Sequence, residues 1–253
     1  MVFLQLAIKS LKNRAFATTL TVISIALSVA LLLSVERAKR AAEDGFMQTV
    51  SKTDLIVGAR SGSLQLLLYT VFNMGTATNN VSYESYQDIS KHPTIAWTIP
   101  YSLGDSHRGF RVVGTNEDFF KHYHYRGDRG IELAQGQGLK ELWDVVIGAD
   151  VARTLKYSLG ERVVISHGVT KGEGIIKHDD KPFVISGIMQ PTGTPLDRAV
   201  YISLEGMEAL HIDWQNGAMP SGDKIIPASQ IKKENLKIHA ITSFFVGTKS
   251  KLD

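Results

Sequence analysis

The chain is divided by one uncharged segment, which reads AFATTLTVISIALSVALLLSV and covers Ala15–Val35. As a helix, its twenty-one residues would be about 31 Å long, because an α-helix rises about 1.5 Å per residue. That length matches the hydrocarbon layer of a membrane. The polar residues of the segment are threonines and serines, whose hydroxyls can bond back to the helix or across to a neighbouring helix. We therefore predict a transmembrane helix over residues 15–35.

Two alternatives are a cleaved signal peptide and a buried core helix. A secretory signal has an apolar core of about 7–15 residues and then a small-residue cleavage site, whereas this longer run is followed by ERAKR at residues 36–40. A soluble helix normally shows a polar stripe, which a few hydroxyl groups do not provide. The sequence favours an uncleaved anchor.

The flanks of the segment extend this interpretation. Residues 1–14 place Leu4, Ala7, Ile8 and Leu11 at helical spacing, which is typical of an interfacial amphipathic helix. Residues 36–50 continue with mixed charges and predict a helical stalk. Three lysines and arginines stand close to the span on each side, so charge favours a cytoplasmic N-terminus only weakly.

The rest of the chain has an ordinary globular composition and is long enough to bury one or two cores. A net charge of +3 with interspersed signs offers no obvious face for nucleic acid. The absence of cysteine excludes disulfides and cysteine–metal sites. The sequence lacks G-x-S-x-G, H-E-x-x-H and the P-loop pattern, so we expect no enzyme and no ATP hydrolysis by this chain.

Residues 51–139 mix predicted helices and strands. A strand is predicted in TDLIVGA, a helix after Ser63 as N-cap, and a second helix after Ser82 as N-cap. Two strands with a turn at Gly104-Asp105 follow, and then a short helix in NEDFFKHYHY. This pattern predicts an α+β lobe.

Residues 140–212 have a different pattern of predicted elements, with more strands. DVVIGADVARTLKYSLGERVVISHG predicts strand, helix, tight turn and strand, and KPFVISGIMQP and RAVYIS predict a strand pair before the helix LEGMEALH. Residues 213–235 are polar with Gly and Pro and predict a linker, whereas residues 236–253 carry a last strand that we expect to return to the first lobe. The predicted fold class is α+β, with a smaller β-rich lobe inserted into the first one.

Histidines are the main candidates for site chemistry. His167 and His178 flank a Gly-rich excursion between two strands, and His211 follows in the same lobe. Together with Asp179 and Asp180 they supply ligand types for Zn²⁺ or a similar ion, although an exposed polar hairpin tip is the simpler interpretation. The sequence predicts surface positions for His122 and His124, and a local ion pair for Asp197 and Arg198.

The order of these features resembles the permease subunits of MacB-like, or FtsX-like, ABC transporters. The resemblance covers essentially the whole chain, and its most specific part is VVIGADVARTL, then LGERVVI and FVISGIM. LKNR before a Thr- and Ser-rich span is also characteristic. It implies an extracytoplasmic, porter-like α+β lobe with an inserted β-rich lobe, a cytoplasmic N-terminus and a place in the bacterial inner membrane. It also implies three further spans, so we expect this chain to be a fragment.

The resemblance further implies partners. Two permease copies, identical or homologous, would assemble in the membrane lipid with separate cytoplasmic ATPase subunits that bind ATP and Mg²⁺, and this chain would carry no catalytic group or cofactor. The outer domain would bind a periplasmic substrate or adaptor protein and move with the ATPase cycle. Two other hypotheses are a single-span sensor, for which fourteen residues before the span leave no room for a signalling domain, and a tethered metal-dependent hydrolase or metal-binding protein built on His167, His178 and His211.

Overall fold

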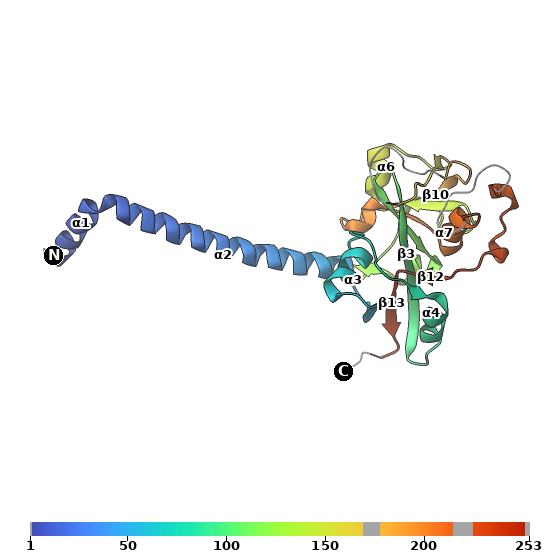
Figure 1. Ribbon diagram of the computed structural model, residues 1–253, viewed down its shortest axis with the longest axis horizontal. Coiled ribbons are helices and arrows are strands. Elements are labelled where there is room, and N and C mark those ends of the chain that lie inside the picture. The colour runs from blue at the N-terminus through green and yellow to red at the C-terminus, as the bar shows by residue number, and fades with distance from the viewer. Residues whose placement is uncertain (1, 169–177, 215–224, 251–253) are drawn as a thin grey trace. The chain divides into compact units, whose positions relative to one another are not determined.

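A computed structural model describes residues 2–168, 178–214 and 225–250 (Figure 1). The described chain forms two units, Met1–Phe46 and Met47–Asp253. Most of the predicted Gly-rich excursion between His167 and His178 lies outside the described residues, as does the first part of the predicted linker.

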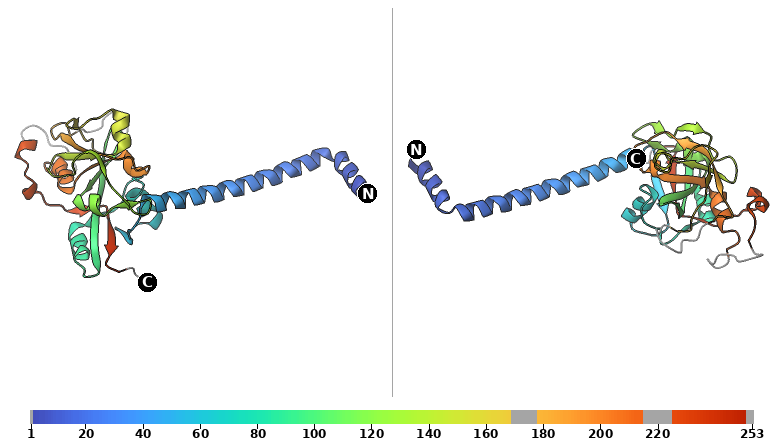
Figure 2. Two further views of the ribbon diagram at one scale, coloured as in Figure 1. Left: turned by 180° about the vertical axis from the view of Figure 1, so that it is seen from behind. Right: turned by 90° about the horizontal axis from the view of Figure 1, so that it is seen from above.

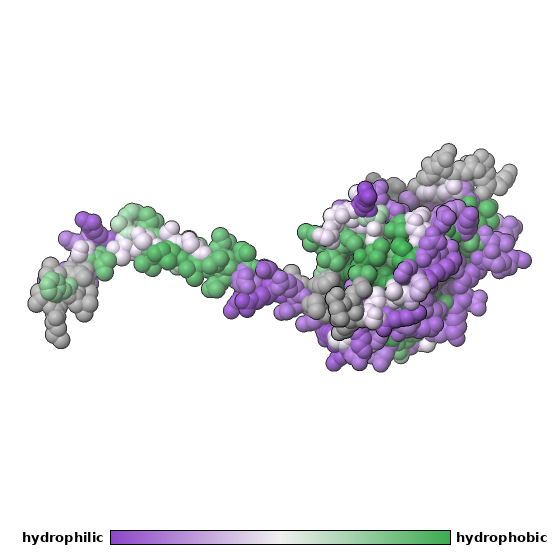
Figure 3. Space-filling view, turned by 90° about the horizontal axis from the view of Figure 1, so that it is seen from below, coloured by the Kyte–Doolittle hydropathy of each residue, from purple (hydrophilic) through white to green (hydrophobic). Residues whose placement is uncertain are grey.

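The first unit is helical. Helix α1 covers Val2–Asn13 and helix α2 covers Ala15–Thr49, so α2 is continuous through the predicted span and stalk. Residues Ala15–Gly45 are long and apolar enough to cross a membrane, and the most apolar window has a mean hydropathy of 2.3 and is not buried in the protein. Figure 3 shows apolar residues along the visible face of this part of the helix and hydrophilic residues after it in α2.

Three hydroxyl groups in the apolar part of α2 bond to the backbone of the helix itself. Thr21, Ser28 and Ser34 each donate to the carbonyl four residues earlier, at 2.9, 2.9 and 2.7 Å. This local bonding leaves an apolar exterior, because the polar atoms are turned onto the helix itself.

The second unit is built on a mixed sheet. Among the described residues nine strands join it, in the order β1-β13-β3-β4-β11-β8-β10-β7, with β9 paired to β10. Two pairs are parallel, β4 with β11 and β8 with β10, and the others are antiparallel. The strands are β1 Leu55–Gly58, β3 Ile95–His107, β4 Phe110–Thr115, β7 Leu133–Gly136, β8 Asp144–Ile147, β9 Arg162–Val163, β10 Phe183–Met189, β11 Ala199–Ser203 and β13 Ser243–Thr248.

Short elements surround the sheet, and Figure 2 shows the strands at the centre of the domain with helices outside them. Strand β2 (Val81–Ser82) pairs with β12 (Ala240–Ile241), and β5 (His124–Tyr125) pairs with β6 (Arg129–Gly130). The helices are α3 Ser63–Thr70, α4 Tyr83–Ser90, α5 Glu117–His122, α6 Ala149–Leu155, α7 Leu204–His211 and the 3-10 turns η1 Pro195–Arg198, η3 Ala228–Gln230 and η4 Lys233–Asn235.

Local signals explain several of these elements. The hydroxyl of Ser82 accepts from the backbone of Ser85 at 3.2 Å, which confirms the predicted N-cap of α4. The predicted cap of α3 is wrong, because Ser63 is the first helical residue and Gly62 is the N-cap, without a side-chain bond. Backbone position, and not residue type, decides the start of α3.

Strand β3 joins the two parts of the sheet. Its first half, Ile95–Tyr101, pairs with β13, and its second half, Ser102–His107, pairs with β4 (Figure 1). The β13 strand lies between β1 and β3, so the last predicted strand does meet the start of the domain. Because β4 also pairs with β11, one sheet contains strands from both predicted lobes. The boundaries of these two lobes stay a prediction.

The predicted turn at Gly104-Asp105 is wrong. Strand β3 continues to His107, and the chain turns at Arg108 and Gly109, which have φ values of 48° and 87°. At residues 103–106 the pairing register shifts instead, which marks a β-bulge. Asp105, Ser106 and His107, at and after this bulge, are all buried.

Candidate functional site

The bulge in β3 places a carboxylate inside the domain. Asp105 is 1% exposed, and its Oδ1 accepts from the backbone N–H of Gly168 at 3.3 Å. Its Oδ2 has no hydrogen-bond partner within the described part of the chain. Burying a carboxylate oxygen without a partner costs free energy, so a hydrogen-bond donor or a cation beside Oδ2 would stabilise the folded domain.

Three histidines surround this carboxylate. His167 follows Ser166, which exchanges two backbone bonds with Ser106 at 3.0 and 2.8 Å, so the end of β3 holds this segment in place. His178 is held by its backbone N–H, which donates to the Ile165 carbonyl at 2.9 Å. His211 is the last residue of α7, a helix capped at its start by the Ser203 hydroxyl.

The side chains converge to a small group. One ligand atom from each of Asp105, His167, His178 and His211 lies within 4.8 Å of all the others. His167 Nδ1 is 3.1 Å from His211 Nε2 and 3.3 Å from Asp105 Oδ1, and His211 Nε2 is 3.6 Å from Asp105 Oδ2. We call these four residues the histidine cluster.

The indole of Trp214 packs against the histidine cluster. Its ring centroid lies 4.7 Å from that of His167, 5.3 Å from His178 and 5.0 Å from His211. His178 is 1% exposed, whereas the side chains of His167 and His211 are 47% and 27% exposed. The cluster therefore has a buried floor formed by Asp105 and His178 and an open side at His167.

Electrostatics separate the histidines. A hydrogen bond to the Asp105 carboxylate raises the pKa of His167 above its ordinary value. Burial lowers the pKa of His178 to about 4, and the neighbouring His211 adds to this effect. At neutral pH His178 is therefore an uncharged imidazole, the form that can donate a lone pair.

A buried ion pair fixes the backbone beside the cluster. Lys181 is 1% exposed, and its Nζ donates to Asp213 at 2.8 Å and to Asp180 at 2.5 Å. Lys181 lies three residues after His178, and Asp213 lies two residues after His211. The pair therefore ties together the two segments that carry these histidines.

The structure brings the three predicted histidines together. His167, His178 and His211 come together as the metal hypothesis requires, although metal binding itself stays a prediction. Asp180 pairs with Lys181, and Asp179 is exposed and is not in the group. Asp105 is absent from the sequence prediction, because a Gly-Asp pair is a typical turn signal and the polar residues around it do not indicate a buried carboxylate.

Other candidate residues have structural roles. His122 stacks on Trp97 with parallel rings 5.3 Å apart, and His124 Nδ1 contacts the carbonyl of His122 at 2.8 Å. The predicted ion pair of Asp197 with Arg198 is wrong. The Asp197 carboxylate is buried and accepts from the backbone N–H groups of Thr192 and Gly193 at 2.9 and 2.8 Å, because it closes the turn before β11.

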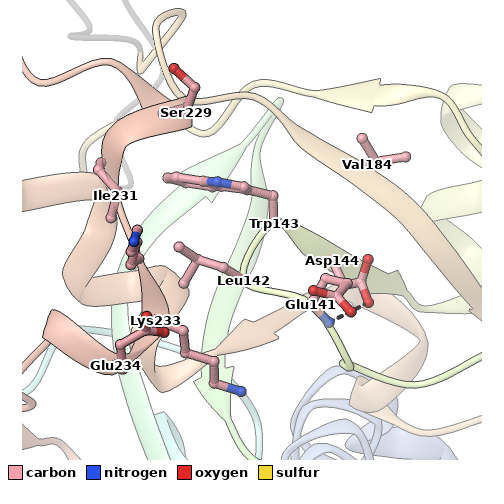
Figure 4. A pocket seen from close by; sticks show the side chains of 11 residues that line it. Glu141, Leu142, Trp143, Asp144, Val184, Ser229, Ile231, Lys233 and Glu234 are labelled. Atoms are coloured by element: carbon pink, nitrogen blue, oxygen red, sulfur yellow. Dashed lines mark hydrogen bonds between the residues drawn. The ribbon is translucent and has the colours of Figure 1, made fainter.

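Arg198 contacts an aromatic ring, and two grooves lie on the surface of the domain. The Arg198 guanidinium lies over the ring of Phe110, 5.8 Å from its centroid. A groove of about 560 Å³ is lined by Leu142, Trp143 and Ile231, which pack together, with Lys233 and Glu234 nearby (Figure 4). A second groove, of about 680 Å³, lies at Phe72, Met74 and the 191–198 turn. Both are open clefts with room for a ligand or a peptide segment.

Comparison with known proteins gives a family match. A family described as the MacB-like periplasmic core domain matches residues 16–230. No curated protein sequence matches the chain.

Two solved structures are among those similar to this chain. The extracellular domain of the noncanonic ABC-type transporter YknZ from Gram-positive bacteria is 12% identical, with a TM-score of 0.41 over 68% of this chain and 74% of that one. The periplasmic region of MacB from Actinobacillus actinomycetemcomitans is 13% identical, with a TM-score of 0.42 over 80% of this chain and 78% of that one.

The fold defines the class of protein: a mixed α/β sheet domain that follows an apolar helix of membrane-spanning length. The sequence match spans both the helix and most of the domain. The chain belongs to the family of MacB-like periplasmic core domains.

Proposed function

We propose that this chain is the N-terminal part of a permease subunit of a MacB/FtsX-type ABC transporter. The observation that carries the proposal is the family match over residues 16–230, which begins inside the apolar helix and continues through the sheet domain. In this function the chain hydrolyses no ATP. It transmits the work of a separate cytoplasmic ATPase subunit to the outer domain, for export, extraction or mechanical signalling.

The connection from α2 to the domain supports such transmission. The carbonyls of Gln48 and Thr49, at the end of α2, accept from the Arg126 backbone at 2.8 Å and from the Tyr123 hydroxyl at 3.1 Å. Tyr123 is 1% exposed. A displacement of the helix end would therefore act directly on core residues, since packed interiors deform little.

The proposal includes a location and partners. The N-terminus lies in the cytoplasm, α2 crosses the inner membrane, and the domain lies in the periplasm. A second permease copy or a homologue supplies the facing helices, and an ATPase subunit binds ATP and Mg²⁺. The two open grooves give the outer domain surfaces for a substrate or an adaptor protein.

Cysteine labelling tests the topology, because the chain has no cysteine of its own. Lys140→Cys lies in the domain and Lys12→Cys lies in α1, and both residues are exposed. A membrane-impermeant maleimide should label Lys140→Cys in intact spheroplasts and Lys12→Cys only after permeabilisation. The reverse pattern would refute the orientation.

Co-purification tests the transporter assignment. The full-length protein, expressed at its natural level and extracted in mild detergent, should retain a cytoplasmic ATPase in fixed stoichiometry. The cysteine-free parent protein serves as the labelling control, and an unrelated single-span protein serves as the purification control. Correct topology without an associated ATPase would point to the single-span sensor.

A further inference from the structure

We propose that the histidine cluster binds one divalent first-row transition-metal ion, with Zn²⁺ as the best fit. The inference is independent of the transporter assignment, because it rests on the geometry of Asp105, His167, His178 and His211 alone.

The donor set and spacing suit a tetrahedral ion. Zn²⁺ takes imidazole nitrogens and carboxylate oxygens at about 2.0–2.1 Å, so neighbouring ligand atoms of a tetrahedron lie about 3.3 Å apart. His211 Nε2 lies 3.1 Å from His167 Nδ1 and 3.6 Å from Asp105 Oδ2, both close to this spacing, whereas the 3.3 Å contact of His167 Nδ1 is to the other carboxylate oxygen, Oδ1. His178 completes the donor set, since one ligand atom from each of the four residues lies within 4.8 Å of the others, and these atoms would draw closer together around a bound ion.

Two buried atoms of the cluster point to a missing partner. Asp105 Oδ2 and His178 Nε2 are both buried and have no hydrogen-bond partner among residues 2–168, 178–214 and 225–250. Native proteins rarely leave such atoms unpaired. One cation between them would satisfy both, and two neighbouring ring nitrogens would complete its shell.

The contacts behind the cluster prepare it for a cation. His211 Nδ1 lies 3.2 Å from the Met207 carbonyl, so its proton is held there and Nε2 presents a lone pair. The apolar ring of Trp214 packs against all three histidines. The His167 side chain is 47% exposed, so this ligand is accessible to solvent.

The nearby charges also favour a cation. Lys181 is positively charged and influences His178, but it is paired with both Asp180 and Asp213. Together with Asp105, the local carboxylates outnumber the ammonium group. A bound divalent ion would therefore neutralise residual negative charge at the floor of the site.

The geometry further indicates a holding site rather than a hydrolytic one. Four protein donors fill a tetrahedral shell, whereas catalytic zinc keeps one position open for water or substrate. The ion would join β3, the segment after β9, the segment before β10 and the end of α7. Metal occupancy would thereby stiffen this side of the domain.

Metal titration of the full-length chain in detergent tests the proposal. After chelation and removal of EDTA, Zn²⁺ alone is titrated in competition with a chromophoric chelator, and Co²⁺ is used as a spectroscopic probe. We expect one ion per chain and the intense visible bands of tetrahedral Co²⁺. Weak octahedral bands, or the absence of stoichiometric binding, would overturn the proposal.

Variants locate the site. His167→Gln should keep the fold, because the side chain is half-exposed, and should weaken Zn²⁺ binding by more than the about 10- to 100-fold typical of outer-shell changes. His92→Gln is the matched control at an exposed histidine outside the cluster and should leave binding unchanged.

His211→Gln provides a second, independent removal of a ligand, and Zn²⁺-dependent thermal stabilisation provides a second readout. If both His167→Gln and His211→Gln bind Zn²⁺ as tightly as the parent while circular dichroism shows them folded, the cluster is only a hydrogen-bonded group. Equal weakening by His92→Gln would likewise refute a specific site.

Discussion

Asp105 is a buried carboxylate at a β-bulge. The pairing register of β3 with β4 shifts at residues 103–106, and Asp105 within this stretch is 1% exposed. The carboxylate then needs partners, and those within reach come from three segments that are distant in sequence.

Gly148, inside the VVIGAD motif, is required by space. A Cβ at this position would lie 2.4 Å from the Asp197 carbonyl oxygen and 2.6 Å from that of Leu196, and both are backbone atoms of the η1 turn. Because backbone cannot rotate away, Gly148→Ala should lower the free energy of unfolding by about 3 kcal/mol. Denaturant unfolding followed by circular dichroism measures this loss.

Gly130→Ala is the control for that substitution. A Cβ there meets nothing within 4 Å, so the change should stay within about 0.5 kcal/mol, as for most surface sites. Equal stability of the two variants would show that η1 can move away from Gly148.

Three buried tyrosines give the domain a predictable alkaline limit. Tyr101, Tyr123 and Tyr201 are at most 1% exposed, and burial raises the pKa of each phenol above its ordinary value. Above about pH 10 the unfolded chain releases these protons and the folded chain keeps them, so stability falls as pH rises. Each group contributes up to about 1.4 kcal/mol per pH unit.

A spectrophotometric titration checks this. Of the eight tyrosines, these three should ionise only as the protein unfolds. Tyr201→Phe should make the fall of unfolding free energy with pH less steep, by up to about 1.4 kcal/mol per pH unit, the contribution of one phenol. Ionisation of all tyrosines together near pH 10, with the structure intact, would contradict the prediction.

At the scale of elements, Lys181 and Asp213 connect the start of β10 with the end of α7. Both side chains are 1% exposed, and their 2.8 Å contact is buried. Removing one partner of a buried pair leaves an uncompensated charge, so Lys181→Met should cost about 3–5 kcal/mol of unfolding free energy. Thermal and denaturant unfolding of the variant measure this.

The double variant Lys181→Met/Asp213→Leu separates the pair from its location. With both charges removed, stability should recover to within about 1–2 kcal/mol of the parent, since a well-packed apolar pair can replace a buried ion pair. A double variant that is as unstable as the sum of its single changes would show that the charges act independently.

At the scale of the whole molecule, the continuity of α2 carries the proposed coupling. A proline within a helix removes a backbone bond and kinks the chain. Ala41 is exposed and lies beyond the most apolar part of α2. In a complex with the ATPase, Ala41→Pro should abolish the nucleotide-dependent movement of a label at Lys140→Cys while ATP hydrolysis continues.

Ala41→Ser is the matched control and should keep the movement, because serine is tolerated in an exposed helix position. If Ala41→Pro moves as the parent does, the helix does not transmit the motion. Distance measurements between paired spin labels in the two nucleotide states decide the outcome.

Local patterns predict much of this fold. The apolar helix, the capped α4 and the strands in DLIVGA, FVISGIM and RAVYIS all follow from residue type and spacing. The turn after His107 and the pairing of β4 with β11 do not, because a bulge and a sheet register depend on distant partners. For the same reason, the sequence indicates the three histidines as a group but not Asp105. Asp105 joins them only through the pairing of its strand in the folded domain.

The position of β13 sets a schedule for biosynthesis. Gly58 of β1 pairs with Ser243 of β13, and β13 also borders β3. Synthesis proceeds at about 5–20 residues per second, so the early strands wait roughly 10–40 s for a partner made roughly 190 residues later. During that interval the edges of β1 and β3 are unpaired templates for other chains. A chaperone that shields nascent strands would therefore raise the yield of this domain more than its final stability.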